Sequence, residues 1–430
     1  MEISPYKINV LVLGSGAREH AIGWKIKQSD KLNKLYFVPG NGGTKDLGTN
    51  INSEINDFES IKKICLKFKI NMLIVGPEGP LVNGICDFFK NDLRLKNIIF
   101  IGPNKLCSKL EGSKDFAKKF LIKNNIPTAK YKSFNKSEIK EAKLFLDSIS
   151  PPYVIKADGL AGGKGVLIFD DITKAKFEIN EMLLNKKFGD SSKKVIIEEF
   201  LDGIELSVFL ILDGENYIIL PSAKDYKKIG EGDSGLNTGG MGAISPVPFL
   251  KKSFFKKIKN KIILPTIAGL KREKINYSGF LFIGLMKFNE EPYVIEYNVR
   301  LGDPETQVIL PRINSDFLDL LIHIKDKNLN NYQIKIDDRF ASTIFLVSGG
   351  YPKKYEINKL IENTNKISDS ILFHGGTKSK NGSLYTSGGR VISVTSINKT
   401  MNDAIKISTK NSEKIKFEKK YYRGDIGFDL

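Results

Sequence analysis

The stretch from Lys156 to Val166 places four glycines and two lysines between two apolar segments. Glycine lets backbone N–H groups close on phosphate oxygens, and lysine brings a positive charge to the same oxygens. The stretch is not a Walker A sequence, because Lys164 is followed by Gly165 rather than by Ser or Thr. It therefore predicts a phosphate grip of another type, with a flexible hairpin as the alternative.

A second segment, at 293–305, carries an acid, an amide and a guanidinium at every second position, as Glu296, Asn298 and Arg300. In a β-strand these three side chains project from one face. Carboxylate and amide oxygens suit Mg²⁺ beside phosphates, and a guanidinium neutralises negative charge. The segment predicts a site for a divalent cation, with a solvated strand face as the alternative.

A third segment joins an apolar stretch at 195–199 to a polar hinge at 200–205. An adenine ring needs an apolar slot and a few backbone hydrogen bonds, which such a hinge offers, and Glu205 has the reach to accept from ribose hydroxyls. Taken alone, this segment is better interpreted as a plain strand followed by a turn.

The first hundred residues alternate short apolar segments with helix-like segments, which is the pattern of a parallel, doubly wound sheet. We expect its strands at 8–13, 35–38, 72–75 and 98–101, each followed by a loop rich in Gly, Pro or Asn. Sheets of this kind bind ligands at the carboxyl ends of their strands.

The rest of the chain predicts α+β structure without internal repeats. We expect a small unit first, then a larger mixed sheet between 206 and 313, and then a separate small domain from Phe340 onward. The expected strands, with one helix at 172–184, lie at 153–157, 166–169, 195–199, 341–347 and 391–394.

Composition limits the possible classes of function. The 67 Lys and Arg residues against 49 Asp and Glu residues give a formal net charge of +18, which fits nucleic acid, a membrane surface or anionic small molecules. The lysines are spread along the chain without the basic, aromatic-interleaved motif of a nucleic-acid module, so a Lys-rich bias is the preferred interpretation. Cys65, Cys86 and Cys107 and the scattered histidines predict free thiols and no zinc site, so any metal should be a hard cation.

No stretch reaches the roughly 20 apolar residues that span a bilayer. The segment from Met1 to Lys7 lacks the charged and apolar regions of a targeting peptide. We therefore expect a soluble, unprocessed, cytoplasmic monomer with no membrane partner and no nucleic-acid partner.

The three segments, in their order and spacing along the chain, resemble the ATP-grasp superfamily, in which ATP lies between a lid sheet and a central sheet. Together with segments at 14–20, 39–44, 76–81, 237–243 and 386–391, they are similar to one family within it, the phosphoribosylamine–glycine ligases. The resemblance covers essentially the whole chain. It implies that ATP, glycine and 5-phosphoribosylamine give glycinamide ribonucleotide, ADP and phosphate through a glycyl phosphate, with Mg²⁺ or Mn²⁺ as the cofactor.

The resemblance also implies a multidomain fold of the α/β and α+β classes. We expect an N-terminal doubly wound parallel sheet at 1–103 and a central ATP-grasp domain at 104–126 and 196–328. A small lid subdomain is expected at 127–195, and a small C-terminal α/β domain at 329–430.

Roles for individual residues follow from the same resemblance. It makes Glu296 and Asn298 the metal ligands, and Arg300, Asp303 and Lys156 the catalytic residues. The implied ATP contacts are Lys114, Lys156, Gly159, Gly162, Gly163, Lys164, Gly165, Glu198, Glu199, Phe200, Leu201 and Glu205. The implied substrate contacts are Gly14, Gly16, Arg18, Glu19, Gly40, Asn41, Glu78, Gly79, Asp225, Thr238, Gly239, Gly240, Met241 and Arg300.

Four positions depart from the family pattern. Tyr226 and Lys228 stand where the pattern has His and Arg, which puts a carboxylate or amide contact of those side chains in question. Gly375 stands where Ala is usual, and Leu301 replaces an aromatic residue. None of these changes removes a carboxylate or lysine assigned above, so we expect ordinary activity.

Four other functions stay open at this point. A nicotinamide dehydrogenase is suggested by Gly14 and Gly16 after a strand, but position 19 is Glu and the second strand lacks the acid that binds a ribose diol. A nucleic-acid-binding protein rests on charge alone. Another ATP-grasp ligase, such as a purine carboxylase or a biotin carboxylase, and an inert ATP-binding relative complete the set.

Overall fold

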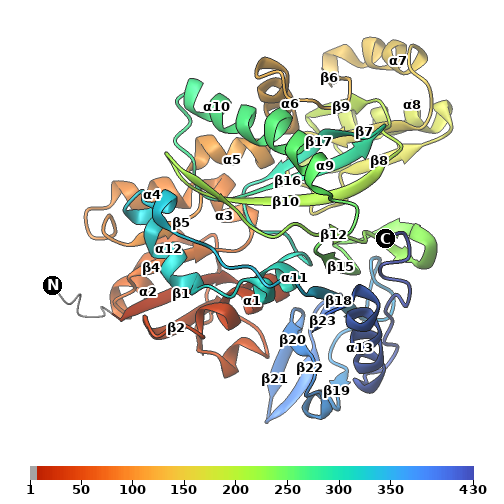
Figure 1. Cartoon of the computed structure of the whole chain (residues 1–430). Coiled ribbons are helices and arrows are strands. Elements are labelled where there is room, and N and C mark those ends of the chain that lie inside the picture. The colour runs from red at the N-terminus through yellow and green to blue at the C-terminus, as the bar shows by residue number, and fades with distance from the viewer. Residues whose placement is uncertain (1–6) are drawn as a thin grey trace.

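The N-terminal part forms a parallel sheet, as the sequence predicted, with strand order β3-β2-β1-β4-β5 (Figure 1), in which the short strand β3 adds to the four expected strands. The computed structural model describes residues 7–430, so most of the segment judged for targeting, Met1–Tyr6, lies outside the described residues. The strand order reverses between β1 and β4, and the crevice at such a reversal is where doubly wound sheets bind ligands. The strands are β1 (Ile8–Gly14), β2 (Leu32–Pro39), β3 (Thr49–Asn50), β4 (Met72–Val75) and β5 (Ile99–Ile101).

Six helices accompany this sheet and lead out of it. Side-chain caps fix several of their starts: Asp57 accepts from the Ser60 N–H group, and Ser113 accepts from the Phe116 N–H group. The helices are α1 (Ala17–Ile26), α2 (Phe58–Lys67), α3 (Glu78–Asn83), α4 (Ile85–Asn91), α5 (Lys105–Gly112) and α6 (Lys114–Lys123).

A small antiparallel sheet with strand order β6-β9-β7-β8 forms the lid, together with two helices that pack on each other. Its apolar core is made of its own residues, among them Ile155, Ile179 and Ile197. The lid therefore folds around a core separate from the rest. Its elements are β6 (Tyr131–Asn135), α7 (Ile139–Asp147), β7 (Tyr153–Ala157), β8 (Val166–Phe169), α8 (Ile172–Leu183) and β9 (Lys194–Glu198).

The central sheet has the order β11-β10-β16-β17, and its neighbouring strands pair antiparallel, so the expectation of a mixed sheet was wrong. The sequence could not show this, because buried antiparallel strands carry the same apolar runs as parallel ones. The strands are β10 (Ile204–Asp213), β11 (Tyr217–Ile219), β16 (Ser278–Phe288) and β17 (Glu291–Asn298). The helices that follow or cover them are α9 (Lys252–Ile258), α10 (Leu264–Arg272), α11 (Thr306–Ile309) and α12 (Phe317–Lys325).

The tail from Phe340 forms the expected C-terminal part, and its main sheet also takes in strands of the central part, which was not expected. Its strands complete a five-stranded sheet, β12-β15-β18-β23-β20, whose first two strands come from the central part of the chain. This sheet contains β12 (Lys224–Asp225), β15 (Gly242–Ser245), β18 (Phe340–Val347), β20 (Ile371–His374) and β23 (Arg390–Asn398). Beside it lie β13 (Lys228–Gly230), β14 (Ser234–Asn237), β19 (Leu360–Ile361), β21 (Thr377–Lys380), β22 (Ser383–Thr386) and α13 (Met401–Lys414).

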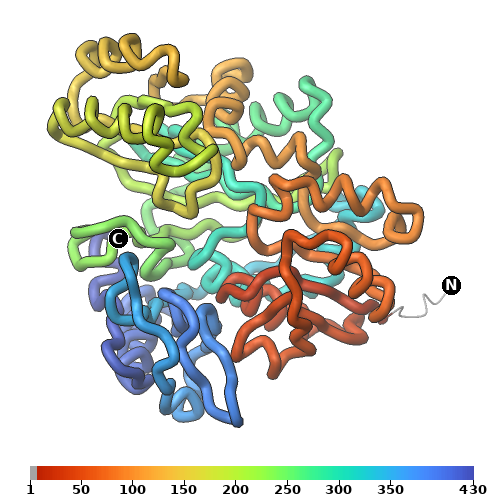
Figure 2. The backbone as a smooth tube through the Cα atoms, turned by 180° about the vertical axis from the view of Figure 1, so that it is seen from behind, coloured from red at the N-terminus to blue at the C-terminus, as the bar shows by residue number. Residues whose placement is uncertain are grey.

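One large core joins the N-terminal, central and C-terminal parts, with Val10, Phe209, Ile244 and Phe345 among its members. Figures 1 and 2 show the N- and C-terminal parts side by side below the central sheet, with the lid at the opposite end. The domain limits given above stay predictions, because sheet and core both cross them. Within residues 7–430, no helix is long and apolar enough to cross a membrane.

A pair of histidines, the buried His20 and the partly buried His374, joins the N- and C-terminal parts. The backbone N–H group of His374 donates to Nδ1 of His20 at 2.8 Å, which requires that nitrogen to be unprotonated. Burial lowers the pKa of His20 well below its ordinary value, and the charge of His374 lowers it further. Burial also lowers the pKa of His374 to about 4, and Lys45 adds to the effect.

We predict that these histidines make the fold sensitive to acid. Below about pH 6.5, each histidine binds a proton in the unfolded chain but not in the folded chain. The free energy of unfolding therefore decreases by about 1.4 kcal/mol for each histidine and each unit by which the pH is lowered. Denaturant titrations at about pH 7 and about pH 5 measure this dependence. His20→Asn should reduce it, whereas His323→Asn, at a partly exposed position of α12, should not. An equal dependence in both variants contradicts the prediction.

Candidate active site

One cleft lies between the lid, helices α5 and α6, and strand β17. It brings together parts of the three segments from which the sequence analysis began. The predicted residues in its lining are Glu78, Lys114, Lys156, Gly162, Gly163, Gly165, Glu198, Glu296, Asn298 and Arg300. We call this hollow the first cleft.

Strand alternation places the lid residues of the first cleft. In β7, Tyr153 and Ile155 point into the lid core, so Lys156 points to the other face. In β9, Ile197 points into the same core and Glu198 into the cleft. The loop between β7 and β8 adds Gly162, Gly163 and Gly165 to the lining of the cleft.

A bulge in the central sheet aims the polar residues of β17. Gly284 pairs with Glu296 but Leu285 pairs with Val294, so one extra residue lies between the two pairs. Val294 points into the core before the bulge, and Tyr297 does so after it. The side chains of Glu296 and Asn298 therefore face the first cleft.

Two buried lysines share one carboxylate in the first cleft. Nζ of Lys156 lies 3.0 Å, and Nζ of Lys118 3.2 Å, from Oε2 of Glu198, while Oε1 of Glu198 has no hydrogen-bond partner among the described residues. Burial raises the pKa of Glu198, but the two lysines outweigh it and hold that pKa below its ordinary value. Burial lowers the pKa of Lys118 to about 8, with Glu198 opposing the shift. The site holds positive charge that burial makes costly and that an anionic ligand would stabilise.

Oxygen atoms suited to a hard cation lie on the opposite wall. Nδ2 of Asn298 donates to Oε1 of Glu296 at 3.1 Å, and Nη2 of Arg300 donates to Oδ1 of Asn298 at 3.2 Å. Burial raises the pKa of Glu296, but Lys227, the Asn298 amide and Lys114 outweigh it, so the carboxylate stays ionised. An ionised carboxylate beside an amide oxygen fits a divalent cation that bridges phosphates.

Arg300 is held by two carboxylates at the edge of the first cleft. Nε lies 3.1 Å from Glu78 Oε2, and Nη2 lies 2.9 Å from Glu111 Oε1. Burial raises the pKa of Glu78, but the charges of Arg300 and Arg18 outweigh it and hold that pKa at about 2. For Glu111 burial prevails and raises the pKa to about 7. Glu78 follows β4, at the reversal of the parallel sheet, so this ion pair joins the first cleft to the ligand crevice of that sheet.

A second cleft lies where the N-terminal, central and C-terminal parts meet. Its lining includes Gly16, Gly40 and Asn41 from the N-terminal part, together with Asp303 and Arg390. These glycines follow strands β1 and β2, so their backbone N–H groups lie at the carboxyl ends of parallel strands. The N–H group of Gly16 donates to Glu19 and that of Gly40 to Gly14. The positive charge available to an anion in this cleft therefore comes from Lys45, Lys378 and Arg390 of its lining.

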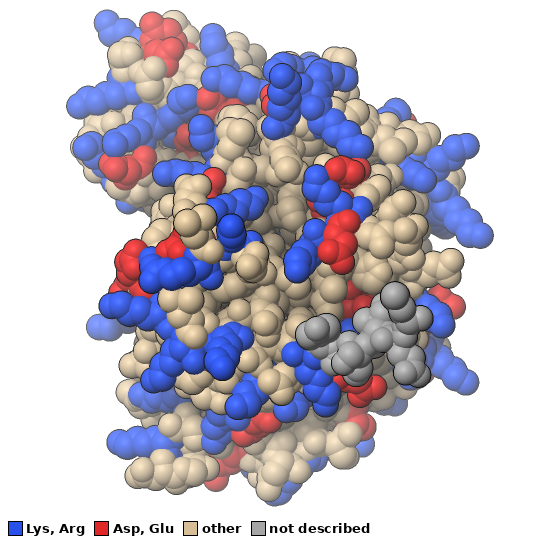
Figure 3. Space-filling model, turned by 90° about the vertical axis from the view of Figure 1, so that its left-hand side faces the viewer, with Lys and Arg blue, Asp and Glu red and all other residues tan. Residues whose placement is uncertain are grey.

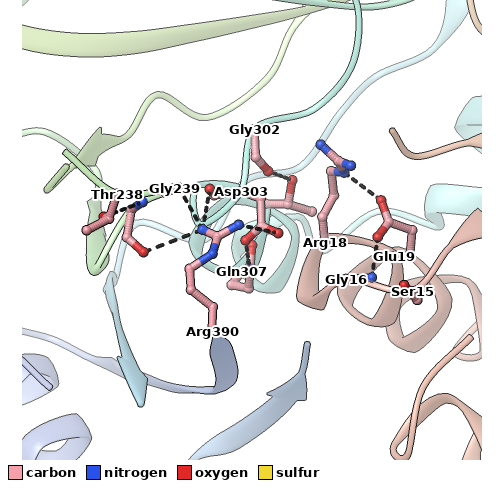
Figure 4. A network of polar contacts seen from close by, with 12 residues as sticks. Ser15, Gly16, Arg18, Glu19, Thr238, Gly239, Gly302, Asp303, Gln307 and Arg390 are labelled. Atoms are coloured by element: carbon pink, nitrogen blue, oxygen red, sulfur yellow. Dashed lines mark hydrogen bonds and ion pairs between the residues drawn. The ribbon is translucent and has the colours of Figure 1, made fainter. Parts of the chain in front are cut away.

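Arg390 is the hub of the polar network beside the second cleft (Figure 4). Its Nη1 donates to the backbone oxygens of Gly239 at 2.7 Å and Asp303 at 2.8 Å, and its Nη2 lies 3.1 Å from Asp303 Oδ2. Gln307 donates to the other carboxylate oxygen of Asp303 at 2.7 Å. One side chain of β23 thus fixes the loop at 238–240 relative to Asp303.

Beside this network, Arg18 donates to Glu19 at 2.6 Å, and Glu19 accepts from the N–H group of Gly16, also at 2.6 Å. A side chain on Gly16 would meet that carboxylate, because its Cβ would lie 2.7 Å from Oε2 of Glu19. Arg18 and Glu19 therefore shape the glycine loop and do not line the second cleft themselves.

Several residues predicted to bind ATP lie outside the lining of the first cleft. Lys164 is exposed on the lid loop, and the N–H group of Gly159 donates to Ser191. Glu199 accepts from the N–H group of Lys130 at 2.8 Å. Phe200 is exposed, Leu201 is buried, and Glu205 forms an ion pair with Lys227. Their roles stay predictions.

The remaining predicted substrate residues surround the two clefts without lining either. Gly14 ends β1, and Gly79 lies in α3. Thr238, Gly239, Gly240 and Met241 form the loop that Arg390 holds, and Asp225 is buried in β12. These roles also stay predictions.

The sequence analysis missed Lys118 and Glu111 in the first cleft and Lys45, Lys378 and Arg390 in the second. Lys118 and Glu111 lie in amphipathic helices, where charged residues are expected on the solvent side. Arg390 was included in the family resemblance, as part of the segment 386–391, but received no role. A charged residue among small residues, as at Gly388-Gly389-Arg390, was the available signal.

The departures from the family pattern leave the clefts intact. Tyr226 and Leu301 are each only 1% exposed and point into the core. Lys228 does not line either cleft. Gly375 approaches the neighbouring strand so closely that an added Cβ would lie 3.0 Å from the backbone oxygen of Arg390.

Comparison with known proteins agrees with this architecture, and the fold with its first cleft defines an ATP-grasp enzyme. Models of the N domain, the ATP-grasp (A) domain and the C domain of phosphoribosylglycinamide synthetase match residues 8–111, 112–306 and 341–429. A phosphoribosylamine–glycine ligase of Fusobacterium nucleatum subsp. nucleatum is 45% identical over 424 residues, 98% of each chain. The chain belongs to the phosphoribosylglycinamide synthetase family, whose members are ligases.

Solved structures support the same placement. The crystal structure of phosphoribosylamine–glycine ligase from Thermotoga maritima is 36% identical and has a TM-score of 0.83, covering 97% of this chain and 100% of that one. The biotin carboxylase domain of a 2-oxoglutarate carboxylase from Hydrogenobacter thermophilus has a TM-score of 0.71 at 16% identity, over 95% of this chain and 90% of that one. The second likeness shows the shared fold alone.

Two adjacent lysines allow a matched test of the first cleft. The Lys118 side chain is 3% exposed and paired with Glu198, whereas Lys119 is 68% exposed and paired with Asp115. We predict that Lys118→Gln weakens nucleotide binding about tenfold, because a buried charge that faces the ligand is lost. Lys119→Gln should bind as the wild type does. Calorimetric titration with ADP measures both, and equal affinities contradict the prediction.

Proposed function

We propose that the chain joins glycine to 5-phosphoribosylamine with the use of ATP, forming glycinamide ribonucleotide, ADP and phosphate. The observation that carries the proposal is that Lys156, Glu198, Glu296, Asn298 and Arg300 line one cleft. That cleft lies beside a second one made of glycine loops. The full-length similarity to phosphoribosylamine–glycine ligases supports the choice of substrates.

In the first step, a carboxylate oxygen of glycine attacks the γ-phosphorus of ATP, and ADP leaves. The product is a glycyl phosphate. The chain contributes position and positive charge, which are the main requirements of phosphoryl transfer. Lys114, Lys156 and the glycines of the lid loop hold the phosphates, and Arg300 faces the transferred group.

Glu296 and Asn298 fit a divalent cation, which we take to be Mg²⁺ or Mn²⁺. Both offer oxygen atoms to the first cleft, and hard cations prefer such ligands. When bound, the cation neutralises charge on the β- and γ-phosphates. Arg300 orients the Asn298 oxygen through its hydrogen bond, and the ionised state of Glu296 is kept by the neighbouring lysines.

In the second step, the amine of phosphoribosylamine attacks the carbonyl carbon of glycyl phosphate. A carbon–nitrogen bond forms, the carbon–oxygen bond to phosphate breaks, and the amine loses one proton. Asp303 is the carboxylate in the lining of the second cleft and is our candidate acceptor for that proton. We place the sugar phosphate against the glycine loops at Gly16 and Gly40, where Lys45 and Lys378 of the same lining offer positive charge.

Charge does not favour nucleic acid as a partner. On the face in Figure 3, Lys and Arg side chains are spread among Asp and Glu rather than gathered in one stripe. Nucleic-acid modules concentrate positive charge on one surface. We also propose, in line with the expectation from the sequence, that the chain acts as a cytoplasmic monomer.

We predict that Glu296→Gln lowers turnover by roughly 10²-fold, because the oxygen ligand that holds the cation loses its charge. Glu291→Gln is the matched control on the same strand, since that side chain pairs with Lys257 and Lys261 outside the cleft. Steady-state rates at saturating substrates measure both variants. Wild-type turnover in Glu296→Gln rejects its role at the metal.

The proposal as a whole is tested by the substrate dependence of ADP release. We expect rapid release only when glycine and phosphoribosylamine are both present, apart from slow hydrolysis of glycyl phosphate. A coupled assay for ADP, with bicarbonate in place of glycine as the control, measures this. Rapid release with bicarbonate assigns the chain to the carboxylases that share its fold.

A further inference from the structure

Residues 224–227 divide their side chains between two sides of the chain. Side chains alternate in extended backbone, and β12 begins this stretch. Lys224 and Tyr226 both contact Asp429: the Lys224 ammonium lies 3.0 Å from Oδ2, and the Tyr226 hydroxyl donates to Oδ1 at 2.8 Å. Lys227 points the other way and forms an ion pair with Glu205.

The ring of Tyr226 is fixed between two cations. Nζ of Lys224 lies 3.9 Å from the ring centroid, and the guanidinium carbon of Arg423 lies 5.4 Å from it. Cations at these distances attract an aromatic ring. The ring is also 6.0 Å from that of Phe428. Tyr226, which departs from the family pattern, thus belongs to a contact with the end of the described chain.

Arg423 extends this contact to the neighbouring hairpin, β13–β14. Its side chain is fully buried, and Nη1 reaches Asp233 at 2.6 Å and the backbone oxygen of Lys228 at 3.2 Å. Asp425 accepts from Arg423 at 2.7 Å and from the N–H group of Gly232 at 2.7 Å. We call residues 423–429 the latch segment, because it holds one side of the stretch 224–233.

The other side of the same stretch is bonded to the loop held by Arg390. The N–H group of Tyr226 donates to Gly242 at 3.0 Å, and Met241 donates to the backbone oxygen of Tyr226 at 2.7 Å. Thr238 donates to the backbone oxygen of Lys227 at 2.7 Å. A shift of Tyr226 would therefore move Lys227 and this loop together.

We propose that the latch segment sets the position of Asp225 and of the loop at 238–241, and that Tyr226 and Asp429 are positioning residues for the ligation. The inference rests on the proposed function, and it takes Asp225 and this loop, which the family resemblance implies as substrate contacts, to be the ones that meet glycine. Neither Tyr226 nor Asp429 lines a cleft, so each acts through its neighbours along the chain.

Two variants test the proposal, each made in the full chain. Tyr226→Phe removes one hydroxyl group and keeps the ring, and Asp429→Asn removes the charge that faces Lys224. We expect each to raise the KM for glycine by about tenfold, which corresponds to about 1.4 kcal/mol. The KM for ATP should rise less than the KM for glycine, because the lid and Glu198 are untouched and only Glu205, the ion-pair partner of Lys227, links this stretch to the implied ATP contacts. The effects of the two changes should be less than additive in the double variant, since Asp429 is the shared partner of Tyr226 and Lys224.

Glu418→Gln is the matched control, because Glu418 belongs to the same C-terminal stretch and pairs with Lys359 away from residues 224–228. Thermal unfolding of each variant reports stability separately. If both variants show wild-type KM values for glycine while the wild type is active, the proposal is wrong, and lower stability with an unchanged KM for glycine contradicts it as well. If Asp429→Asn fails to fold, Tyr226→Phe still decides. Absence of glycine-dependent ADP release in the wild type and in Glu418→Gln overturns the proposed function instead.

Discussion

Buried positive charge is the constraint on which the first cleft depends. Lys156 and Lys118 have 7% and 3% exposed side chains, and an ammonium group so far from water is costly unless an anion faces it. Glu198 supplies that anion in the free protein, through one of its two oxygens. A polyphosphate entering the cleft brings more negative charge than Glu198 alone. Glu198 thus holds both lysines at the cleft in the free protein, and a polyphosphate adds to the negative charge that stabilises them.

The geometry of two sheets orients the charged side chains of the first cleft. The lid strands place apolar side chains on one face and Lys156 and Glu198 on the other. In the central sheet a single bulge at Ile295 changes which side chains face the core, and so directs Glu296 and Asn298 toward the lid. Neither wall would work alone, because phosphate oxygens need both the lysines and the cation that the two walls hold. The site is therefore a property of two sheets facing each other.

The sequence predicted whatever depends on local spacing. The alternation of side chains along a strand predicted that Glu296 and Asn298 share one face. The alternation of apolar and helix-like segments predicted the parallel sheet. Both patterns arise from residues that are neighbours in the chain. The antiparallel central sheet and the strands shared by the central and C-terminal parts were not predicted, because pairing partners lie up to about a hundred residues apart and leave no periodic signal. Lys118 and Arg390 were not predicted for the same reason. Each resembles a surface residue in the sequence, and only the structure shows its partner, Glu198 for Lys118 and Asp303 for Arg390.

The separate core of the lid has a consequence for how the two walls meet. Ile155, Ile179 and Ile197 pack within the lid, whereas the N-terminal, central and C-terminal parts share one large core. A unit with its own core can change its angle to the rest without opening either core, which is the usual requirement for a lid. Gly162 and Gly163 have positive φ, and an added Cβ at either would meet no atom within 4 Å, so the lid loop is free to follow a nucleotide. Arg300 ties the wall carried by β17 to Glu78 and Glu111, so a change in the angle of the lid alters the distance of Lys156 from a wall that is anchored elsewhere.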